Sequence, residues 1–163
     1  MKRFEGKNVV ITGAAAGIGQ ATAQRIAEEG GNCALIDINA EGLMHRVWVR
    51  DTLLYVGSAA GLEIWDIADE QAPSRLSWTP LPLNDFCVQE SLAYVIGADD
   101  SFRVYSVADP ESPCQIGVCR DSGYSVAVTG GTALVGDRWG LYVLDVSDPA
   151  SPHRVSSWGS AID

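Results

Sequence analysis

The chain has 163 residues, of which 47% are apolar, and its formal net charge is −10 at pH 7. Such a length suits one domain or two small ones, and the apolar fraction is enough for a sizeable core. The negative charge opposes binding to phosphate backbones and to anionic membrane surfaces, so nucleic acid is not expected as a partner.

The sequence shows no targeting, membrane or metal signal. No apolar run approaches the length of a membrane span, and the charged segment MKRFEGKNVV does not resemble a secretory signal. The four cysteines, at positions 33, 87, 114 and 119, show no CxxC spacing, so no metal site is predicted. Free, partly buried thiols in a reducing compartment are the simplest interpretation, and the default location is cytoplasmic.

The segment 1–43 predicts a strand, a glycine turn, a helix and a second strand. The apolar run Lys7 to Gly13 suits a buried parallel strand, and the helix should extend from Gly17 to Gly30, where two glycines end it. The second strand is expected over Cys33 to Asn39. The helix should bury one face, made of Ile18, Ala21, Thr22, Ile26 and Ala27. This order of elements predicts a Rossmann-like βαβ unit.

The turn between the first strand and the helix is the candidate cofactor site. Its sequence is T-G-A-A-A-G-I-G, and the glycines leave room for the backbone to approach a pyrophosphate. The helix N-terminus then offers free N–H groups and a partial positive charge. Asp37 follows the second strand, where an acid should accept hydrogen bonds from ribose hydroxyls. The candidate cofactor-binding residues are Thr12, Gly13, Gly17, Ile18, Gly19 and Asp37, with an inherited tight turn that binds nothing as the open alternative.

This stretch, from about Lys2 to Leu43, resembles the short-chain dehydrogenase/reductase family, whose glycine motif is T-G-x-x-x-G-x-G. The resemblance implies an oxidoreductase, and an acid at the Asp37 position implies NAD rather than NADP, because a carboxylate repels the 2′-phosphate. The family's catalytic Tyr-x-x-x-Lys pair has no counterpart, since the only lysines are Lys2 and Lys7 and both precede every tyrosine. No catalytic residue is therefore assigned, and NAD is expected to bind weakly at most.

The remainder of the chain is built on a repeat of about 40 residues. The segments GLEIWDIADEQAP, SFRVYSVADPESP and GLYVLDVSDPASP start at Gly61, Ser101 and Gly140, at nearly equal intervals. Two apolar stretches precede each copy and one alternating stretch follows it, so each unit should hold four short strands.

A fixed period of this size with four strands per unit is typical of a β-propeller blade. The string VLDVSDPASP closely resembles the LVIVD-repeat family, a propeller family often found at the cell surface, and this resemblance covers about three quarters of the chain. It specifies the repeat type and implies no catalytic residues. Asp-Pro pairs set the turn in the second and third copies, whereas Asp69-Glu70 in the first copy should make a looser turn.

Two groups of side chains in the repeats are candidate ligands, each with a structural alternative. Asp66 and Asp145 lie inside predicted strands, and they either face a central channel or, by the favoured interpretation, bond neighbouring backbone. The tryptophans form either a stacking surface or, again by the favoured interpretation, packing contacts between blades. The five tryptophans are Trp48, Trp65, Trp78, Trp139 and Trp158.

The overall prediction is a mixed fold. Residues 1–43 should form a partial Rossmann-like βαβ unit, and residues 44–163 three four-stranded antiparallel β-propeller-type blades at about 44–82, 83–122 and 123–163. The chain resembles a chimera, because helix-period sequence changes to blade sequence within a few residues near Met44.

The expected function is a non-catalytic binding or scaffold protein with an unknown protein or small-molecule ligand and a vestigial NAD-binding segment. The alternative is a truncated NAD-dependent oxidoreductase. Three blades would leave two apolar blade faces uncovered. Either the βαβ segment folds back over one face, or two chains pair as three plus three blades around a two-fold axis, and a homo-oligomer is expected.

Overall fold

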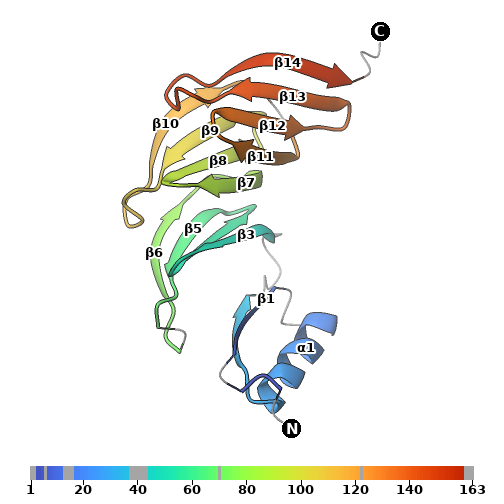
Figure 1. The fold of residues 1–163 in the computed structure, drawn as a ribbon, viewed down its shortest axis with the longest axis vertical. Coiled ribbons are helices and arrows are strands. Elements are labelled where there is room, and N and C mark those ends of the chain that lie inside the picture. The colour runs from blue at the N-terminus through green and yellow to red at the C-terminus, as the bar shows by residue number, and fades with distance from the viewer. Residues whose placement is uncertain are drawn as a thin grey trace.

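The structure is a computed structural model that describes residues 3–5, 7–12, 17–36, 44–69, 71–121 and 123–159. These residues form a small βαβ unit followed by three four-stranded sheets, which succeed one another in chain order (Figure 1). The predicted mixed architecture is therefore present at the level of secondary structure.

The βαβ unit consists of β1 (Asn8–Thr12), α1 (Gly17–Glu28) and β2 (Asn32–Ile36). The two strands pair in parallel, with Thr12 opposite Ile36. The helix ends as the sequence predicts, because Gly30 adopts a positive φ of 87° that most residues avoid. The N–H groups of Gly30 and Gly31 then bond the carbonyls of Ala27 and Ile26 at 3.0 and 2.9 Å, which completes a Schellman-type end.

The predicted buried face of α1 is largely wrong. Ala23 and Ile26 are buried and pack with Ile11 of β1, whereas Ile18 is 88% exposed. The other exposed members of the predicted face are Ala21, Thr22 and Ala27. Among the described residues, only the two-stranded sheet and Phe4 contact this helix's apolar side, so the buried stripe is narrow. A wider stripe would need further strands beside β1 and β2.

Each repeat unit folds into one antiparallel sheet whose strands pair in chain order. The first sheet holds β3 (Met44–Arg50), β4 (Leu53–Ser58), β5 (Gly61–Asp66) and β6 (Ser74–Thr79). The second sheet holds β7 (Leu83–Gln89), β8 (Leu92–Gly97), β9 (Phe102–Ser106) and β10 (Cys114–Cys119). The third sheet holds β11 (Ser125–Thr129), β12 (Thr132–Gly136), β13 (Gly140–Asp145) and β14 (His153–Gly159). The prediction of four short strands per repeat is confirmed.

The three sheets also share an irregularity in the last strand. The register shifts by one residue where β6, β10 and β14 pair with the preceding strand, and this leaves Leu76, Ile116 and Val155 without a pairing partner. These bulged residues are all apolar and occupy the same position of the repeat. Bulges bend a strand and increase its twist, so each last strand deviates in the same place.

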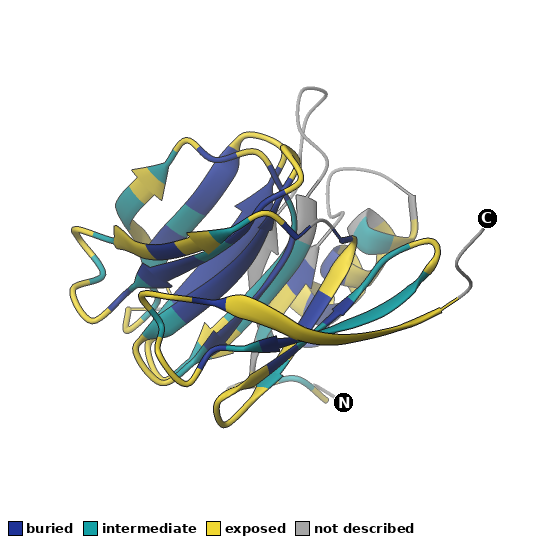
Figure 2. Ribbon diagram, turned by 90° about the horizontal axis from the view of Figure 1, so that it is seen from above, coloured by how far each residue is buried: buried dark blue, intermediate teal, exposed yellow. Residues whose placement is uncertain are grey.

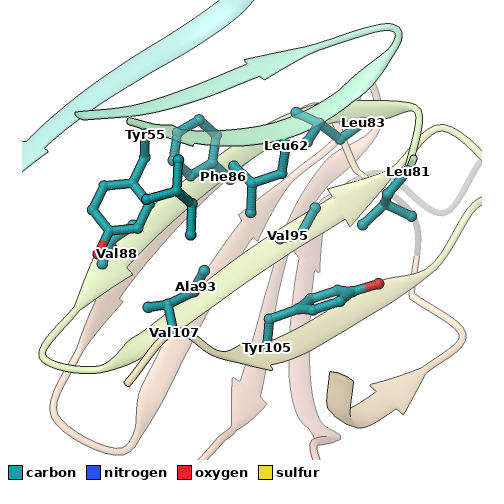
Figure 3. Packing of buried hydrophobic residues seen from close by; sticks show 11 residues of the cluster. Tyr55, Leu62, Leu81, Leu83, Phe86, Val88, Ala93, Val95, Tyr105 and Val107 are labelled. Carbon is teal, nitrogen blue, oxygen red and sulfur yellow. The ribbon is translucent and has the colours of Figure 1, made fainter. Parts of the chain in front are cut away.

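The core lies between the sheets rather than within one of them. One cluster of buried side chains joins the first and second sheets, and Figure 3 shows Tyr55 and Leu62 of the first sheet beside Phe86 of the second. A second cluster joins the second and third sheets through residues such as Phe102 and Leu144. The second sheet is thus covered on both faces, whereas β14 is exposed along its whole length (Figure 2).

The turn before each last strand has the same hydrogen bonds in all three copies. The Asp109 and Asp148 side chains each accept the N–H two residues ahead, at 3.1 Å in both cases. Asp69 accepts the Gln71 N–H at 3.0 Å, and the Ala72 N–H bonds the Asp69 carbonyl at 3.0 Å. The expected loosening of the first turn is therefore not seen in these bonds, because the Asp side chain and not the proline forms them.

These turns also space the sheets. The Ser77 hydroxyl of β6 donates to the Pro110 carbonyl of the next sheet's turn at 2.7 Å. At the equivalent position of β10, a Cβ atom on Gly117 would lie only 2.0 Å from the Pro149 carbonyl oxygen. The Asp-Pro turn of one sheet thus rests directly on the last strand of the sheet before it.

Candidate functional site

The glycine turn that the sequence singles out is only partly described. Thr12 ends β1, Gly17 begins α1, and Gly19 is half-buried in the first turn of the helix. Gly13 and Asp37 lie outside the described residues, directly after the paired strand ends Thr12 and Ile36.

The described part of the turn still has anion-binding chemistry. The first turn of α1 contains no acidic residue, so its free N–H groups and positive dipole end are not neutralised by a side chain of that turn. Ile18 is 88% exposed there, which is unusual for an isoleucine in a helix of this kind. A pyrophosphate could bind these N–H groups, and a nucleoside could cover Ile18.

A second candidate site lies where the first strands of the three sheets meet. β7 contacts both β3 and β11, and these three strands line a cavity of about 350 Å³. Its lining residues come from all three sheets and are Arg46, Trp48, Cys87, Val88, Gln89, Val126, Ala127, Val128, Thr129 and Gly130.

Asp85 holds these three strands together. Both of its carboxylate oxygens accept from the Arg46 guanidinium of β3 at 2.9 Å. One oxygen also accepts the buried Val126 N–H of β11 at 2.8 Å. Asp85 itself is 6% exposed. Removal of this carboxylate would leave a buried backbone donor without an acceptor.

Gln89 is one of the lining residues and carries a buried polar atom. Among the described residues, the Gln89 Oε1 atom has no hydrogen-bond partner. Trp48 lies half-buried on the opposite strand, with the Arg46 guanidinium 5.7 Å from its ring centroid. The Trp48 indole at the cavity favours a ligand with a flat apolar face.

Three tyrosines of the sheets are buried in the core. Tyr55, Tyr94 and Tyr105 are at most 8% exposed, and burial raises the pKa of each hydroxyl. Burial likewise raises the pKa of the Cys87 thiol to about 11. A group that must act as a general acid or base near neutral pH needs a pKa shifted in the opposite direction.

The favoured interpretation of the strand aspartates holds. Asp66 accepts the Ala68 N–H at 2.8 Å, and Asp145 accepts the Ser147 N–H at 2.8 Å and the Ser147 hydroxyl at 2.6 Å. Both carboxylates therefore close local turns. The described residues include no cluster of His, Cys, Asp and Glu that could hold a metal, and none of their helices could cross a membrane.

The packing interpretation of the tryptophans holds for only part of the set. Trp48 packs against both interface clusters, and the Trp65 indole N–H donates to Glu63 at 2.8 Å. The remaining three are more than half exposed, namely Trp78, Trp139 and Trp158. Trp78 and Trp158 lie on the outermost strands β6 and β14, and Trp139 lies in the loop before β13, so the packing interpretation does not hold for these three.

No sequence pattern indicated Arg46, Asp85 or Gln89 as site residues. Arg46 and Asp85 occupy equivalent positions of consecutive repeats, and Ser125 stands at that position in the third copy. A search for shared residues passes over such a position, because its members are complementary and not identical. Opposite charges at one repeat position are the signal that could have found this pair.

Comparison with known proteins divides the chain in two. Residues 7–73 match the family described as short chain dehydrogenase, and residues 122–158 match the LVIVD repeat. Both resemblances are confirmed. The dehydrogenase match continues through β3, β4 and β5, although these strands belong to the first antiparallel sheet.

Several curated proteins described as oxidoreductases or dehydrogenases are similar to this chain over a short stretch. An uncharacterized oxidoreductase of Bacillus subtilis, YxbG, is 42% identical over 72 residues, which is 44% of this chain and 25% of that protein. A 7alpha-hydroxysteroid dehydrogenase of Bacteroides fragilis is 51% identical over 41 residues, or 25% of this chain and 16% of that protein. The chain thus spans about a quarter or less of these relatives.

Two solved structures share the fold of the sheets at low sequence identity. The computationally designed Ika4 protein has a TM-score of 0.58 at 11% identity, over 75% of this chain and 76% of that one. The N-terminal domain of Nup159 has a TM-score of 0.51 at 9% identity, over 71% of this chain and 30% of that one. The TM-scores indicate a shared fold. Sequence identities this low give no information on function.

Proposed function

We propose that the chain is a non-catalytic β-propeller-type binding or scaffold protein that carries a vestigial NAD-binding βαβ segment. The observation that supports this most is the meeting of β3, β7 and β11 around a cavity lined by Trp48 and Gln89. In a propeller the first strands of the blades surround the central axis, where ligands have access to several blades at once.

The proposed ligand of the sheets is a protein or small molecule with a flat apolar face for Trp48. The Arg46 guanidinium is already paired with Asp85, so the cavity has no unpaired cation for a phosphate among its described lining residues. With the overall charge of −10, this disfavours nucleic acid as the ligand.

The NAD segment is proposed to be vestigial because its site needs walls that the described βαβ unit does not supply. Two parallel strands and one helix provide the turn for a pyrophosphate, whereas a dinucleotide site lies in a crevice between two sets of strands. Contacts limited to one turn and one acid leave little affinity after the cost of ordering the ligand.

The second candidate function is that of an NAD-dependent oxidoreductase. The dehydrogenase match over residues 7–73 favours it. Its difficulty is chemical, since Lys2 and Lys7 are the only lysines and neither can form the family's Tyr-x-x-x-Lys pair. Under this alternative an unrecognised group would have to move the proton.

Calorimetric titration of the full chain with NAD and with NADP tests the cofactor part of the proposal. We expect a dissociation constant for NAD on the order of 1 mM or weaker, and weaker binding still after Asp37→Ala. Asp66→Ala is the matched control, because the Asp66 carboxylate closes a local turn in the first sheet. Tight NAD binding, or a preference for NADP, would contradict the proposal.

A further inference from the structure

Equivalent positions of the three sheets differ sharply in exposure. We define the forward face of a sheet as the face turned toward the next sheet in chain order, and the rear face as the opposite one. Forward-face positions are 0% exposed at Ile64 of the first sheet and 0% at Val104 of the second. The equivalent residue of the third sheet, Val143, is only half-buried.

Other forward-face positions show the same difference in exposure between the third sheet and the first two. Leu62 and Phe102 are 1% and 0% exposed, whereas Leu141 is half-buried. Beside Leu141, across the β13–β14 pairing, Trp158 is 66% exposed. The third sheet therefore presents an apolar forward face of the same design as the two that are covered.

The rear face of the first sheet is open in part: its central residues Leu54 and Val56 are 5% and 7% exposed, whereas residues around them are more exposed than their equivalents in the second sheet. Val88, on the rear face of the second sheet, packs against the first sheet and is 5% exposed. Its equivalent Val49, on the rear face of the first sheet, is 50% exposed. Trp65 and Ile67 stand at the positions of the buried Tyr105 and Val107 and are half-buried.

We propose that these two open faces bind each other between two copies of the chain. The forward face of the third sheet would cover the rear face of the first sheet of a second copy, and the reverse contact would follow by two-fold symmetry. A second copy of the chain is the expected occupant, because a forward face already packs on a rear face at both internal interfaces. Six sheets in a closed ring lie within the range of about four to eight blades known for propellers.

The contact would be stable because it repeats an existing one. Burial of apolar surface stabilises an interface by roughly 25 cal/mol per Å², and Val49 and Trp158, at 50% and 66% exposed, still have much of their surface to bury. The Asp69 turn of the second copy's first sheet would contribute too. Ser156 of β14 stands at the position where Ser77 bonds the turn of the following sheet.

Light scattering coupled to size exclusion, over a dilution series of the full chain, tests the pairing. We expect a concentration-dependent dimer of twice the 17.3 kDa chain mass. Val49→Glu and Val143→Glu, one on each open face, should each raise the dimer dissociation constant roughly tenfold or more. Val118→Glu is the matched control. Val118 is also 50% exposed, but it lies on β10 of the second sheet and belongs to neither of the two open faces.

Mixing the two variants distinguishes forward-to-rear pairing from pairing of like faces. A mixture of Val49→Glu and Val143→Glu retains one undamaged contact per heterodimer, so it should dimerise more tightly than either variant alone. Circular dichroism before each run confirms that the variants fold. A monomer throughout the series, assemblies larger than a dimer, an undisturbed Val49→Glu dimer, or an equal loss with Val118→Glu would each overturn the proposal.

Discussion

Replacement of Asp85 by alanine should destabilise the stack of sheets more than replacement of any exposed aspartate. The carboxylate accepts from Arg46 at 2.9 Å and from the buried Val126 N–H at 2.8 Å, so one residue connects all three sheets. The Arg46 side chain is 38% exposed and can be rehydrated, which limits that part of the loss to about 1 kcal/mol. The Val126 N–H is buried and cannot be rehydrated in the same way, and an unsatisfied buried donor costs ~1–3 kcal/mol.

The expected total loss for Asp85→Ala is therefore about 2–4 kcal/mol, a large share of the ~5–15 kcal/mol that stabilises a typical domain. Urea denaturation followed by circular dichroism would measure the free energy of unfolding by linear extrapolation. The control is Asp99→Ala. Asp99 pairs with Arg103 and its own side chain is 58% exposed, so its replacement should lower the free energy of unfolding by less than about 1 kcal/mol. Equal losses in the two variants would refute the role of Asp85 as the link between sheets.

Three further predictions follow from individual contacts. Gly117→Val should lower the free energy of unfolding by roughly 1–3 kcal/mol, measured by the same urea titration, because its Cβ would lie 2.0 Å from the Pro149 carbonyl; an unchanged stability would contradict the spacing role of the turn. Alkylation followed by peptide mass spectrometry should label exposed Cys114 before buried Cys87, whose pKa is raised to about 11, with Cys87 labelling rising only at strongly alkaline pH; early labelling of Cys87 would contradict its burial. Hydrogen bonds from Arg103 hold the pKa of Asp99 well below its usual range. The stability contributed by this pair is therefore present above the unfolded pKa of about 3.9 and is lost as the pH falls below it. In acid the melting temperature of Asp99→Asn should approach that of the unchanged chain, and a difference that widens in acid would contradict this sign.

The repeat made the sheets predictable. Three copies of one pattern, at nearly equal spacing along the chain, specify strand number and turn chemistry together, because each local signal recurs in register. The helix end at Gly30 was equally accessible, since a glycine with positive φ is a local requirement.

The errors arise where the neighbours of an element decide its environment. The buried stripe of α1 depends on which strands lie beneath it, and periodicity alone does not reveal that Ile18 has no cover. Likewise, a tryptophan such as Trp158 fits a packing position whose covering sheet is not among the described residues. The Asp85 link was missed because it joins different residue types at equivalent positions.

Hydride transfer is the property that separates the proposed binding protein from an oxidoreductase most directly. The full chain would be mixed with NAD or NADH and a broad panel of alcohols and ketones near neutral pH, and the absorbance of NADH would be followed. With no lysine after Lys7 to support a catalytic tyrosine, we expect no rate above the protein-free control. Turnover that disappears on Asp37→Ala would contradict the non-catalytic function and would place an active dehydrogenase site in this chain.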